Sequence, residues 1–432
     1  MSIKTVTVIG ANGTMGSNIC GIFASFGGAK VYAMCRTKEK ALAAVEKAAK
    51  SVKCESIQRN LIAADYEDME KCVRESDLIF ESVAEQETVK KSVLQRAAEF
   101  MRENAILCTG TSGLSVEKLS ECIPERVQKC FMGMHFFNPP YNLILCEMIA
   151  TQKVNRELFD SLCDYAENQL LRKVVKVTDT PGFLGNRIGF QFINKAVQYA
   201  DKYKKDGGID YIDSILGGFT GRAMPPIMTS DFVGLDVHKF IVDYIKENTN
   251  DFENNSFVFP EYAERLVTEG KLGKKVQQGF YKTIIDEGKK VQCVYDIETG
   301  EYRRVKNYHL YFAEKMREFI QESRYLEAYE LLRNSQEKEA EICKEFLVDY
   351  VLYSVIINET VGESRYAADD AMAYGFNWCP PLGIVEVLGG KDIFLNMVEE
   401  YLIKHNIKEI NRNKVETLIV KSQYNYAKFF KV

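Results

Sequence analysis

Residues 5–16 read Thr-Val-Thr-Val-Ile-Gly-Ala-Asn-Gly-Thr-Met-Gly, and this stretch decides the fold of the first part of the chain. The five residues before the first glycine predict a buried strand, and the apolar residues of 19–26 predict a helix. Between them, the glycines permit a tight turn, and the helix N-terminus offers free amides to a pyrophosphate. With a second strand expected at 31–34, this order of elements is typical of a dinucleotide-binding unit. The residues expected to contact the dinucleotide are Gly10, Asn12, Gly13, Thr14, Met15 and Gly16.

This unit departs from the usual pattern in two ways. The glycines are spaced G-x-x-G-x-x-G, one residue longer than G-x-G-x-x-G. The second strand ends in Cys35-Arg36-Thr37, where an acid normally binds the 2′-hydroxyl of the ribose. An arginine suits a 2′-phosphate, so Arg36 makes NADP a candidate cofactor. Stacking of Arg36 over the adenine, or plain solvation, is equally consistent with the sequence.

Composition sets the class of protein. With 432 residues, 46% of them hydrophobic, the chain can form two to four domains with a large core. A net charge of -5, with the positive residues spread along the chain, argues against nucleic acid or an anionic membrane as partner. The twelve cysteines contain no Cys-x-x-Cys pair, which favours reduced thiols, no metal site and a cytoplasmic location. The first strand begins too early to leave room for a signal peptide, and no apolar run is long enough to span a membrane.

Strands and helices alternate over residues 1–180, which predicts a doubly wound parallel sheet of the Rossmann type. Helices are expected at 37–59 and 67–76, and further strands at 77–83, 105–108 and 173–177. Ligands of such sheets bind at the carboxyl ends of the strands, and Glu85, Lys90 and Ser112 follow such ends. Ser112 could equally cap a helix at 116–119, and the local sequence favours the cap.

The stretch Gly133-Met-His-Phe-Phe-Asn-Pro139, with Glu147 twelve residues after the histidine, is the candidate for chemistry. His135 is one of only four histidines, and a neutral imidazole can accept a proton at physiological pH. A carboxylate on its other ring nitrogen would fix the tautomer. The alternative is a hydrogen-bonded core histidine with Glu147 solvated at a strand end, and the stretch alone favours that alternative.

The remainder of the chain is mostly helical. Asn186 falls in the first turn of a long helix after Pro181-Gly182, either as a cap or pointing into an interdomain cleft. The pairs Pro225-Pro226 and Pro380-Pro381 are each followed by a glycine at the same separation, which indicates two related helical domains. The expected domains are 1–180, 181–282 and 306–432, with a linker hairpin at 283–305 whose strands are 291–295 and 302–305.

Over nearly its whole length the chain resembles the 3-hydroxyacyl-CoA dehydrogenase family. The tandem helical domains are similar to longer bacterial forms in which an enoyl-CoA hydratase module is often fused, although this sequence contains no such module. The matching pieces are Gly10–Gly16, Glu81–Lys90, Thr111-Ser112, His135–Pro139, Glu147, Pro181–Arg187, Met224-Pro225, Val233–Asp236 and Lys275–Tyr281.

The resemblance implies a function in fatty acid metabolism, in β-oxidation: the interconversion of L-3-hydroxyacyl-CoA and 3-ketoacyl-CoA by hydride transfer with NAD. It implies that His135 is the acid-base residue and Glu147 its orienting carboxylate. Ser112 and Asn186 would then bond the reacting oxygen and the thioester side of the substrate. The remaining implied roles are cofactor contacts at Glu85, Lys90 and Lys275, and a CoA contact at Ser51.

Two positions depart from the family pattern, since Gly110 replaces an asparagine and Cys35 replaces the ribose-binding acid. Two other functions remain open: a dehydrogenase of a free hydroxy acid such as carnitine or a sugar acid, and a catalytically idle nucleotide-binding protein. The resemblance is also consistent with a homodimer or a monomer, and with a separate enoyl-CoA hydratase as partner.

Overall fold

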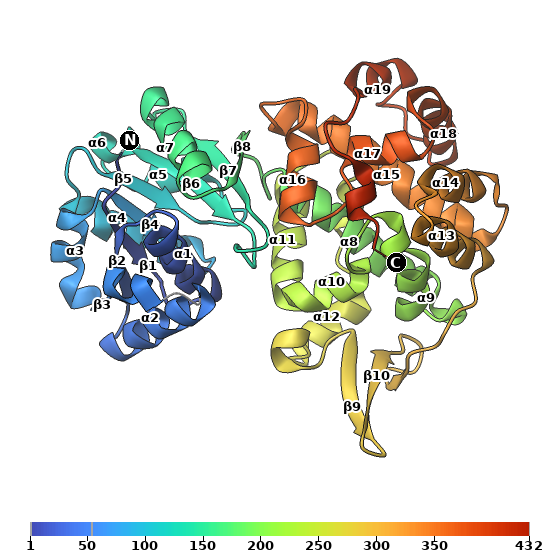
Figure 1. The fold of residues 1–432 in the computed structure, drawn as a ribbon, viewed down its shortest axis with the longest axis horizontal. Helices are drawn as coiled ribbons and strands as arrows, with labels where there is room; N and C mark the ends of the chain where they lie inside the picture. The colour runs from blue at the N-terminus through green and yellow to red at the C-terminus, as the bar shows by residue number, and fades with distance from the viewer. Residues whose placement is uncertain (1, 53–54, 432) are drawn as a thin grey trace. The chain divides into compact units, whose positions relative to one another are not determined.

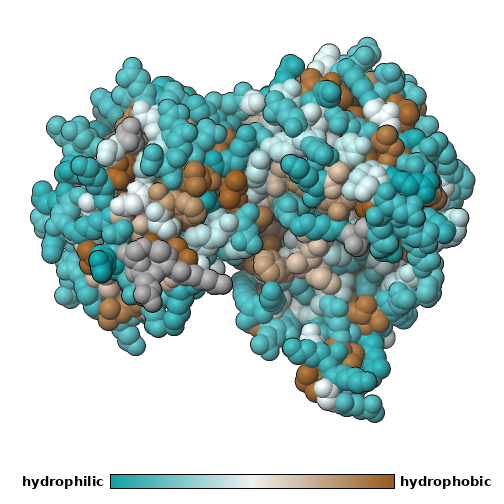
Figure 2. Space-filling model, in the orientation of Figure 1, coloured by the Kyte–Doolittle hydropathy of each residue, from teal (hydrophilic) through white to brown (hydrophobic). Residues whose placement is uncertain are grey.

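A computed structural model describes residues 2–52 and 55–431. The chain divides into two compact units (Figure 1). The first comprises Met1–Phe183 and Val361–Asp370, and the second comprises Leu184–Thr360 and Ala371–Val432. Hydrophilic side chains cover most of the visible face of each unit (Figure 2). Within the described residues, no helix combines the length and the apolar character needed to cross a membrane.

The first unit is built on an eight-stranded sheet flanked by helices, with strand order β3-β2-β1-β4-β5-β6-β7-β8. The strands are β1 (Thr5–Ile9), β2 (Lys30–Cys35), β3 (Leu61–Asp65), β4 (Leu78–Glu81), β5 (Ile106–Thr109), β6 (Phe131–Phe136), β7 (Leu145–Ala150) and β8 (Lys173–Val177). The helices are α1 (Thr14–Ser25), α2 (Lys38–Val52), η1 (Glu55–Asn60), η2 (Tyr66–Asp68), α3 (Met69–Glu75), α4 (Glu87–Phe100), α5 (Val116–Ser120), α6 (Glu125–Gln128) and α7 (Arg156–Asn168).

The sheet is doubly wound, as the sequence predicted, but it is not parallel throughout. Strands β1 to β6 are parallel, whereas β7 runs antiparallel to β6 and β8 runs parallel to β7. The reason is the length of the connection between β6 and β7, residues 137–144. A parallel crossover needs a dozen or more residues, so this short loop can only return the chain in the opposite direction.

Strand β8 lies at the edge of the sheet and is covered by a segment from much later in the sequence. The amide of Thr178 donates to the carbonyl of Val361 at 2.8 Å, and the amide of Glu363 donates to the carbonyl of Lys176 at 3.1 Å. Lys173 also pairs with Asp370 at 3.1 Å. Because these contacts occupy backbone groups of an otherwise open edge, residues 361–370 belong structurally to the first unit.

The second unit is mainly helical and also carries a three-stranded sheet of order β11-β10-β9. Its strands are β9 (Tyr281–Asp286), β10 (Lys289–Tyr295) and β11 (Tyr302–Arg304), so the two strands predicted for the hairpin are present and β9 adds a third. Its helices are α8 (Gly185–Lys202), η3 (Lys204–Asp206), α9 (Ile209–Ile215), η4 (Gly218–Thr220), α10 (Pro226–Val233), α11 (Leu235–Asn248), η5 (Asn254–Phe257), α12 (Glu261–Thr268), η6 (Lys274–Val276), α13 (Tyr311–Gln321), α14 (Tyr325–Asn334), α15 (Lys338–Val361), α16 (Ala367–Gly375), α17 (Pro381–Val387), α18 (Lys391–Lys404), α19 (Arg412–Leu418) and η7 (Tyr426–Phe429).

The two proline pairs take the same structural role. Pro226 is the first residue of α10 and Pro381 is the first residue of α17, a position where the missing amide of proline costs nothing. The glycines that follow, Gly234 and Gly389, have φ angles of +108° and +102°, which lie in the region that favours glycine. Each glycine is followed by a helix of fourteen residues, α11 or α18.

The long helices α8 and α15 pack against each other and enclose a group of buried charges. The ring of Phe192 contacts that of Phe346 at a centroid distance of 5.2 Å. Nearby, the ammonium of Lys195 lies 2.7 Å from an Asp349 carboxylate oxygen and 3.4 Å from one of Glu253. Two acids therefore share one cation. Burial and the Asp349 charge raise the pKa of Glu253 to about 7.

This raised pKa predicts a pH-dependent stability. Between its ordinary value of 4.5 and about 7, Glu253 is protonated more in the folded than in the unfolded chain. The free energy of unfolding therefore falls as the pH rises through this interval. In Glu253→Gln that contribution, at most about 3 kcal/mol, should disappear from urea-unfolding curves recorded between pH 5 and pH 8. Glu247→Gln, an exposed neighbour, should keep the wild-type slope, and an equal slope in both variants would contradict the assignment.

Candidate functional site

The glycine-rich turn after β1 fits a phosphate-binding loop. The amides of Gly10 and Ala11 donate to the carbonyl of Met34, which ties the turn to the end of β2. A Cβ atom on Gly16 would lie 2.9 Å from the Cα atom of Ala11, so the close approach of α1 to the turn requires glycine. Helix α1 begins at Thr14 without a side-chain cap and without an acid in its first turn. Its first amides are therefore suited to an anionic group such as a pyrophosphate.

The residues that end and follow β2 are mainly positive, with Arg36, Lys38 and Lys40 against Glu39. The thiol of Cys35 is buried, and burial raises its pKa, so it is neutral near pH 7. Arg36 is exposed, and within the described residues no carboxylate forms an ion pair with it. Lys38 is paired with Asp68 at 2.9 Å, whereas the charge of Lys40 acts on the Cys35 thiol. One carboxylate lies close by, because Asp65 of β3 is the register partner of Cys35.

His135 on β6 and Glu147 on β7 face each other on neighbouring strands. They are directly opposite in the antiparallel register of β6 and β7, so their side chains lie on the same face of the sheet. The Nδ1 atom of His135 lies 2.8 Å from a carboxylate oxygen of Glu147. His135 is 4% exposed and Glu147 is fully buried, so the alternative of a solvated carboxylate at a strand end is wrong.

Aromatic rings surround this pair. The centroid of the His135 ring lies 4.6 Å from that of Phe137 and 5.6 Å from that of Phe183. The imidazole is thus flanked by two phenyl rings and bonded to a buried carboxylate through Nδ1. Its other ring nitrogen, Nε2, is the one that can contact a ligand. Asn138 was not among the residues predicted to act at the site. Asn138 is exposed and directly follows β6, the strand that carries His135, which makes it a further candidate to contact a ligand.

Glu85, Lys90 and Ser112, separated in the sequence, come together at the ends of β4 and β5. The ammonium of Lys90 lies 2.9 Å from a carboxylate oxygen of Glu81 and 3.2 Å from one of Glu85. The Glu85 carboxylate accepts hydrogen bonds from the Ser112 amide, at 2.8 Å, and from the Thr111 hydroxyl. Glu85 therefore fixes the backbone at Ser112.

The alternative role for Ser112, as a helix cap, is wrong. Helix α5 begins at Val116, and its cap is Ser115, whose hydroxyl accepts a hydrogen bond from the Lys118 amide at 3.2 Å. The two serines lie only three residues apart, so a pattern that tolerates an error of a few residues cannot separate them.

Gly110 is matched to its surroundings. A Cβ atom at this position would lie 2.7 Å from the ring of Phe80, which itself packs edge-on against Phe23 and Phe136. The space that the family's asparagine would require is filled by Phe80. The ring of Phe80 on β4 therefore fills the volume that a side chain at residue 110 would occupy. Residues 80 and 110 are far apart in the sequence, so no local pattern predicts this.

The other predicted residues lie elsewhere. Ser51 is exposed near the end of α2, where its hydroxyl donates to the Lys47 carbonyl. A surface hollow of about 410 Å³ is lined by Ala43, Glu46, Lys47, Lys50 and Ser51. Asn186 and Lys275 belong to the second unit. Asn186 is buried in the first turn of α8, whose cap is Leu184, so it is not a cap. Lys275 forms an ion pair with Asp236.

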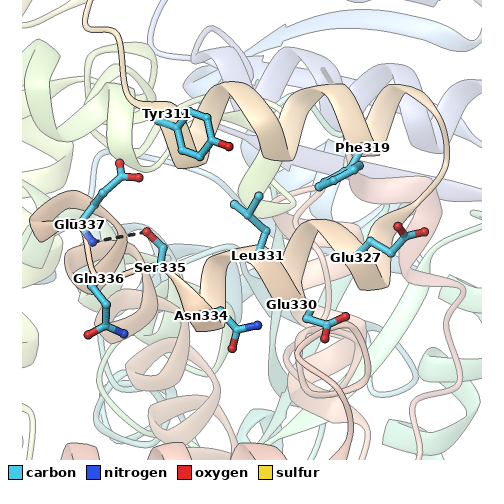
Figure 3. Close-up of a pocket in the computed structure, with 9 residues that line it drawn as sticks. All are labelled: Tyr311, Phe319, Glu327, Glu330, Leu331, Asn334, Ser335, Gln336 and Glu337. Carbon is cyan, nitrogen blue, oxygen red and sulfur yellow. Dashed lines mark hydrogen bonds between the residues drawn. The ribbon is translucent and has the colours of Figure 1, made fainter.

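A larger groove of about 700 Å³ lies between α13 and α14 of the second unit (Figure 3). Tyr311 and Phe319 on α13 face Leu331 on α14, and Glu327 and Glu330 lie along its rim (Figure 3). None of the residues singled out in the sequence lines this groove.

The fold and the glycine-rich loop define a Rossmann-type dinucleotide-binding protein with a helical second unit. Residues 5–180 match the family model for the NAD binding domain of 3-hydroxyacyl-CoA dehydrogenase, and residues 182–283 match the model for its C-terminal domain. The chain belongs to the 3-hydroxyacyl-CoA dehydrogenase family, which confirms the resemblance seen in the sequence.

Human mitochondrial hydroxyacyl-coenzyme A dehydrogenase is 32% identical over 295 residues, which cover 65% of this chain and 91% of that protein. A trifunctional enzyme of a fatty acid oxidation complex from Rickettsia felis is 25% identical over 362 residues, covering 82% of this chain and 48% of the relative. The chain thus spans about half the length of that relative, and 38% of a related Bacillus subtilis 3-hydroxyacyl-CoA dehydrogenase. The solved structure of 3-hydroxybutyryl-CoA dehydrogenase from Escherichia coli K12 has a TM-score of 0.71 and 19% identity, covering 97% of this chain and 99% of that one. That likeness shows that the fold is shared along nearly the whole chain.

The match between Gly110 and Phe80 predicts a double-variant effect on stability. Gly110→Asn alone should lower the thermal midpoint, because the new side chain collides with Phe80 at a cost of about 1–3 kcal/mol. Phe80→Val alone should also destabilise, because it leaves a cavity. The double variant should lose less than the sum of the two, which thermal unfolding by circular dichroism would measure. Strict additivity would show that the two positions are not coupled.

Proposed function

We propose that the protein is an oxidoreductase that interconverts L-3-hydroxyacyl-CoA and 3-ketoacyl-CoA with a nicotinamide cofactor. The observation that carries the proposal is the buried His135–Glu147 contact of 2.8 Å at the carboxyl end of β6. The glycine-rich loop after β1 also lies at the carboxyl ends of the parallel strands, on the same side of the sheet. Family membership supports the substrate class, because several relatives are named as hydroxyacyl-CoA dehydrogenases.

His135 acts as the acid-base residue. Its Nδ1–H donates to the Glu147 carboxylate, which leaves the lone pair on Nε2 available to the substrate. In the oxidation direction Nε2 accepts the proton of the 3-hydroxyl group, and Glu147 stabilises the imidazolium that forms. The bound nicotinamide supplies the hydride acceptor. In the reduction direction His135 returns the proton to the oxygen of the 3-ketone.

The other residues hold the substrate and the cofactor. The hydroxyl of Ser112, on a backbone fixed by Glu85, bonds the reacting oxygen, and Asn186 bonds the thioester side. Lys275 is a further proposed contact of the cofactor, and in the second unit its ammonium pairs with Asp236. Ser51, in the hollow on α2, contacts the CoA moiety.

Loss of the imidazole or its carboxylate should stop turnover without unfolding the protein. We expect His135→Gln and Glu147→Gln each to lower kcat for acetoacetyl-CoA reduction by about 10³-fold, because proton transfer or its orientation is lost. Cofactor binding and circular dichroism should stay unchanged. His309→Gln is a matched control on an exposed histidine, and it should keep full activity.

Other substrates separate this function from its alternatives. Turnover of acetoacetyl-CoA, with none of carnitine or a sugar acid, supports the acyl-CoA reaction. Turnover of a free acid alone would identify the dehydrogenase of a free hydroxy acid. A wild-type protein that binds NAD(H) but turns over no acyl-CoA would identify an idle nucleotide-binding protein.

For the cofactor, we propose that the end of β2 accepts a 2′-phosphate, so that the enzyme uses NADP(H) at least as well as NAD(H). Three properties of that strand end support this choice: the neutral Cys35 thiol, the exposed Arg36 guanidinium, for which the described residues provide no ion pair, and the nearby Lys40. A planar guanidinium can bind a phosphate through two hydrogen bonds at once.

Reversal of the charge at residue 36 tests this choice. In Arg36→Asp the carboxylate should repel the 2′-phosphate and bond the ribose hydroxyls instead. The ratio of kcat/KM with NADPH to that with NADH should therefore fall by about 10²-fold. Arg59→Asp, in η1, provides a control for the loss of positive charge on the same unit. An unchanged ratio in Arg36→Asp would show that Arg36 does not read the phosphate.

A further inference from the structure

Two buried charges and one partly exposed charge lie against the loop that holds Ser112. Glu81 is fully buried at the end of β4, and its carboxylate accepts hydrogen bonds from the Thr109 hydroxyl at 2.7 Å and from the Val83 amide at 2.6 Å. Lys90 is also fully buried and lies between Glu81 and Glu85. The side chain of Glu85 is 24% exposed. Each polar group in this cluster therefore has a defined partner, and only Glu85 faces solvent.

The cluster does not balance its charges. It contains two carboxylates and one ammonium, and in the described part of the chain Lys90 is the sole cation that pairs with either acid. Burial alone would lower the pKa of Lys90, but the two carboxylates outweigh burial and hold it above its usual value. Lys90 therefore stays charged, and the cluster keeps an excess of one negative charge.

This excess charge lies on the side of the sheet that receives the nicotinamide in the proposed function. A Cβ atom on Gly10 would collide with the backbone oxygen of Ser82, so the glycine-rich turn touches the residue that follows Glu81. In a Rossmann-type sheet the pyrophosphate lies over that turn and the adenosine ribose over the end of the second strand. The other half of the dinucleotide then extends over the ends of β4, β5 and β6, where Glu85, Ser112 and His135 lie.

We propose that the Glu81–Lys90–Glu85 cluster makes the site discriminate between the redox states of its cofactor, binding the oxidised form more tightly than an uncharged cluster would. This inference rests on the cofactor site of the proposed function. The oxidised nicotinamide ring carries a positive charge and the reduced ring carries none, so a fixed negative charge beside the ring favours the oxidised state. Glu85 acts as a positioning residue for Ser112 and also supplies this charge.

The test measures the dissociation constants of the oxidised and the reduced cofactor for the same protein, without substrate, by isothermal titration calorimetry. In Glu85→Gln the amide oxygen can still accept the bonds from Ser112 and Thr111, but the excess charge is gone. The ratio Kd(oxidised)/Kd(reduced) should rise by about tenfold. Glu87→Gln removes an exposed charge two residues later and should leave the ratio unchanged.

A second variant tests the inference by itself. Glu85→Asp keeps the charge of the cluster but shortens the side chain that accepts the bonds from Ser112 and Thr111. This variant should leave the ratio within about twofold of the wild-type value. A merely structural role for the cluster predicts the opposite, since the shorter side chain should disturb these contacts more than the isosteric amide of Glu85→Gln does.

The possible outcomes are decisive. An equal weakening of both redox forms in Glu85→Gln, an unchanged ratio in that variant, or a ratio shifted about tenfold in Glu85→Asp would each overturn the inference. Failure of the wild-type protein to bind either form would overturn it as well. Absence of acyl-CoA turnover, with the ratios behaving as expected, would instead contradict the proposed substrate and leave the discrimination by charge supported.

Discussion

The antiparallel pairing of β6 with β7 is the constraint on which the candidate active site depends. Eight residues, 137–144, connect the two strands, and a loop of this length cannot carry a parallel crossover. The return of the chain places His135 directly opposite Glu147, in the interior of the sheet where neither is solvated. A buried imidazole and a buried carboxylate are each costly alone, so their contact of 2.8 Å stabilises both.

The parallel part of the sheet supplies the remainder of the site in a different way. The carboxyl ends of β1, β2, β4 and β5 meet at one edge and bring together the glycine-rich turn, Arg36, Glu85 and Ser112. At this edge the chain keeps buried charges in contact with one another rather than with water. Glu81 anchors Lys90, Lys90 anchors Glu85, and Glu85 fixes the amide of Ser112. The position of one hydroxyl thus depends on a chain of ionic contacts that begins in the core.

The two copies of the proline and glycine repeat share their local structure but differ in their contacts. Both copies begin a helix at the second proline and end it before a glycine of positive φ. Only the later copy also contributes a segment, residues 361–370, that bonds to the edge of β8 in the first unit. Because β8 pairs with β7, the strand that carries Glu147, this late segment covers the edge strand next to the strand of Glu147.

The sequence by itself determined what is local. The glycine-rich turn and the strand that precedes it followed from neighbouring residues, because strand and helix preferences are set by neighbouring side chains. The two related helical domains followed from the repeated proline and glycine spacing, and the family from motifs in the right order. Tertiary structure decided the direction of β7, the serine that caps α5, the exchange of volume between Gly110 and Phe80, and the place of residues 361–370. Each of these depends on contacts between residues distant in the chain, and the energy of such contacts is fixed only when the backbone has brought the groups together.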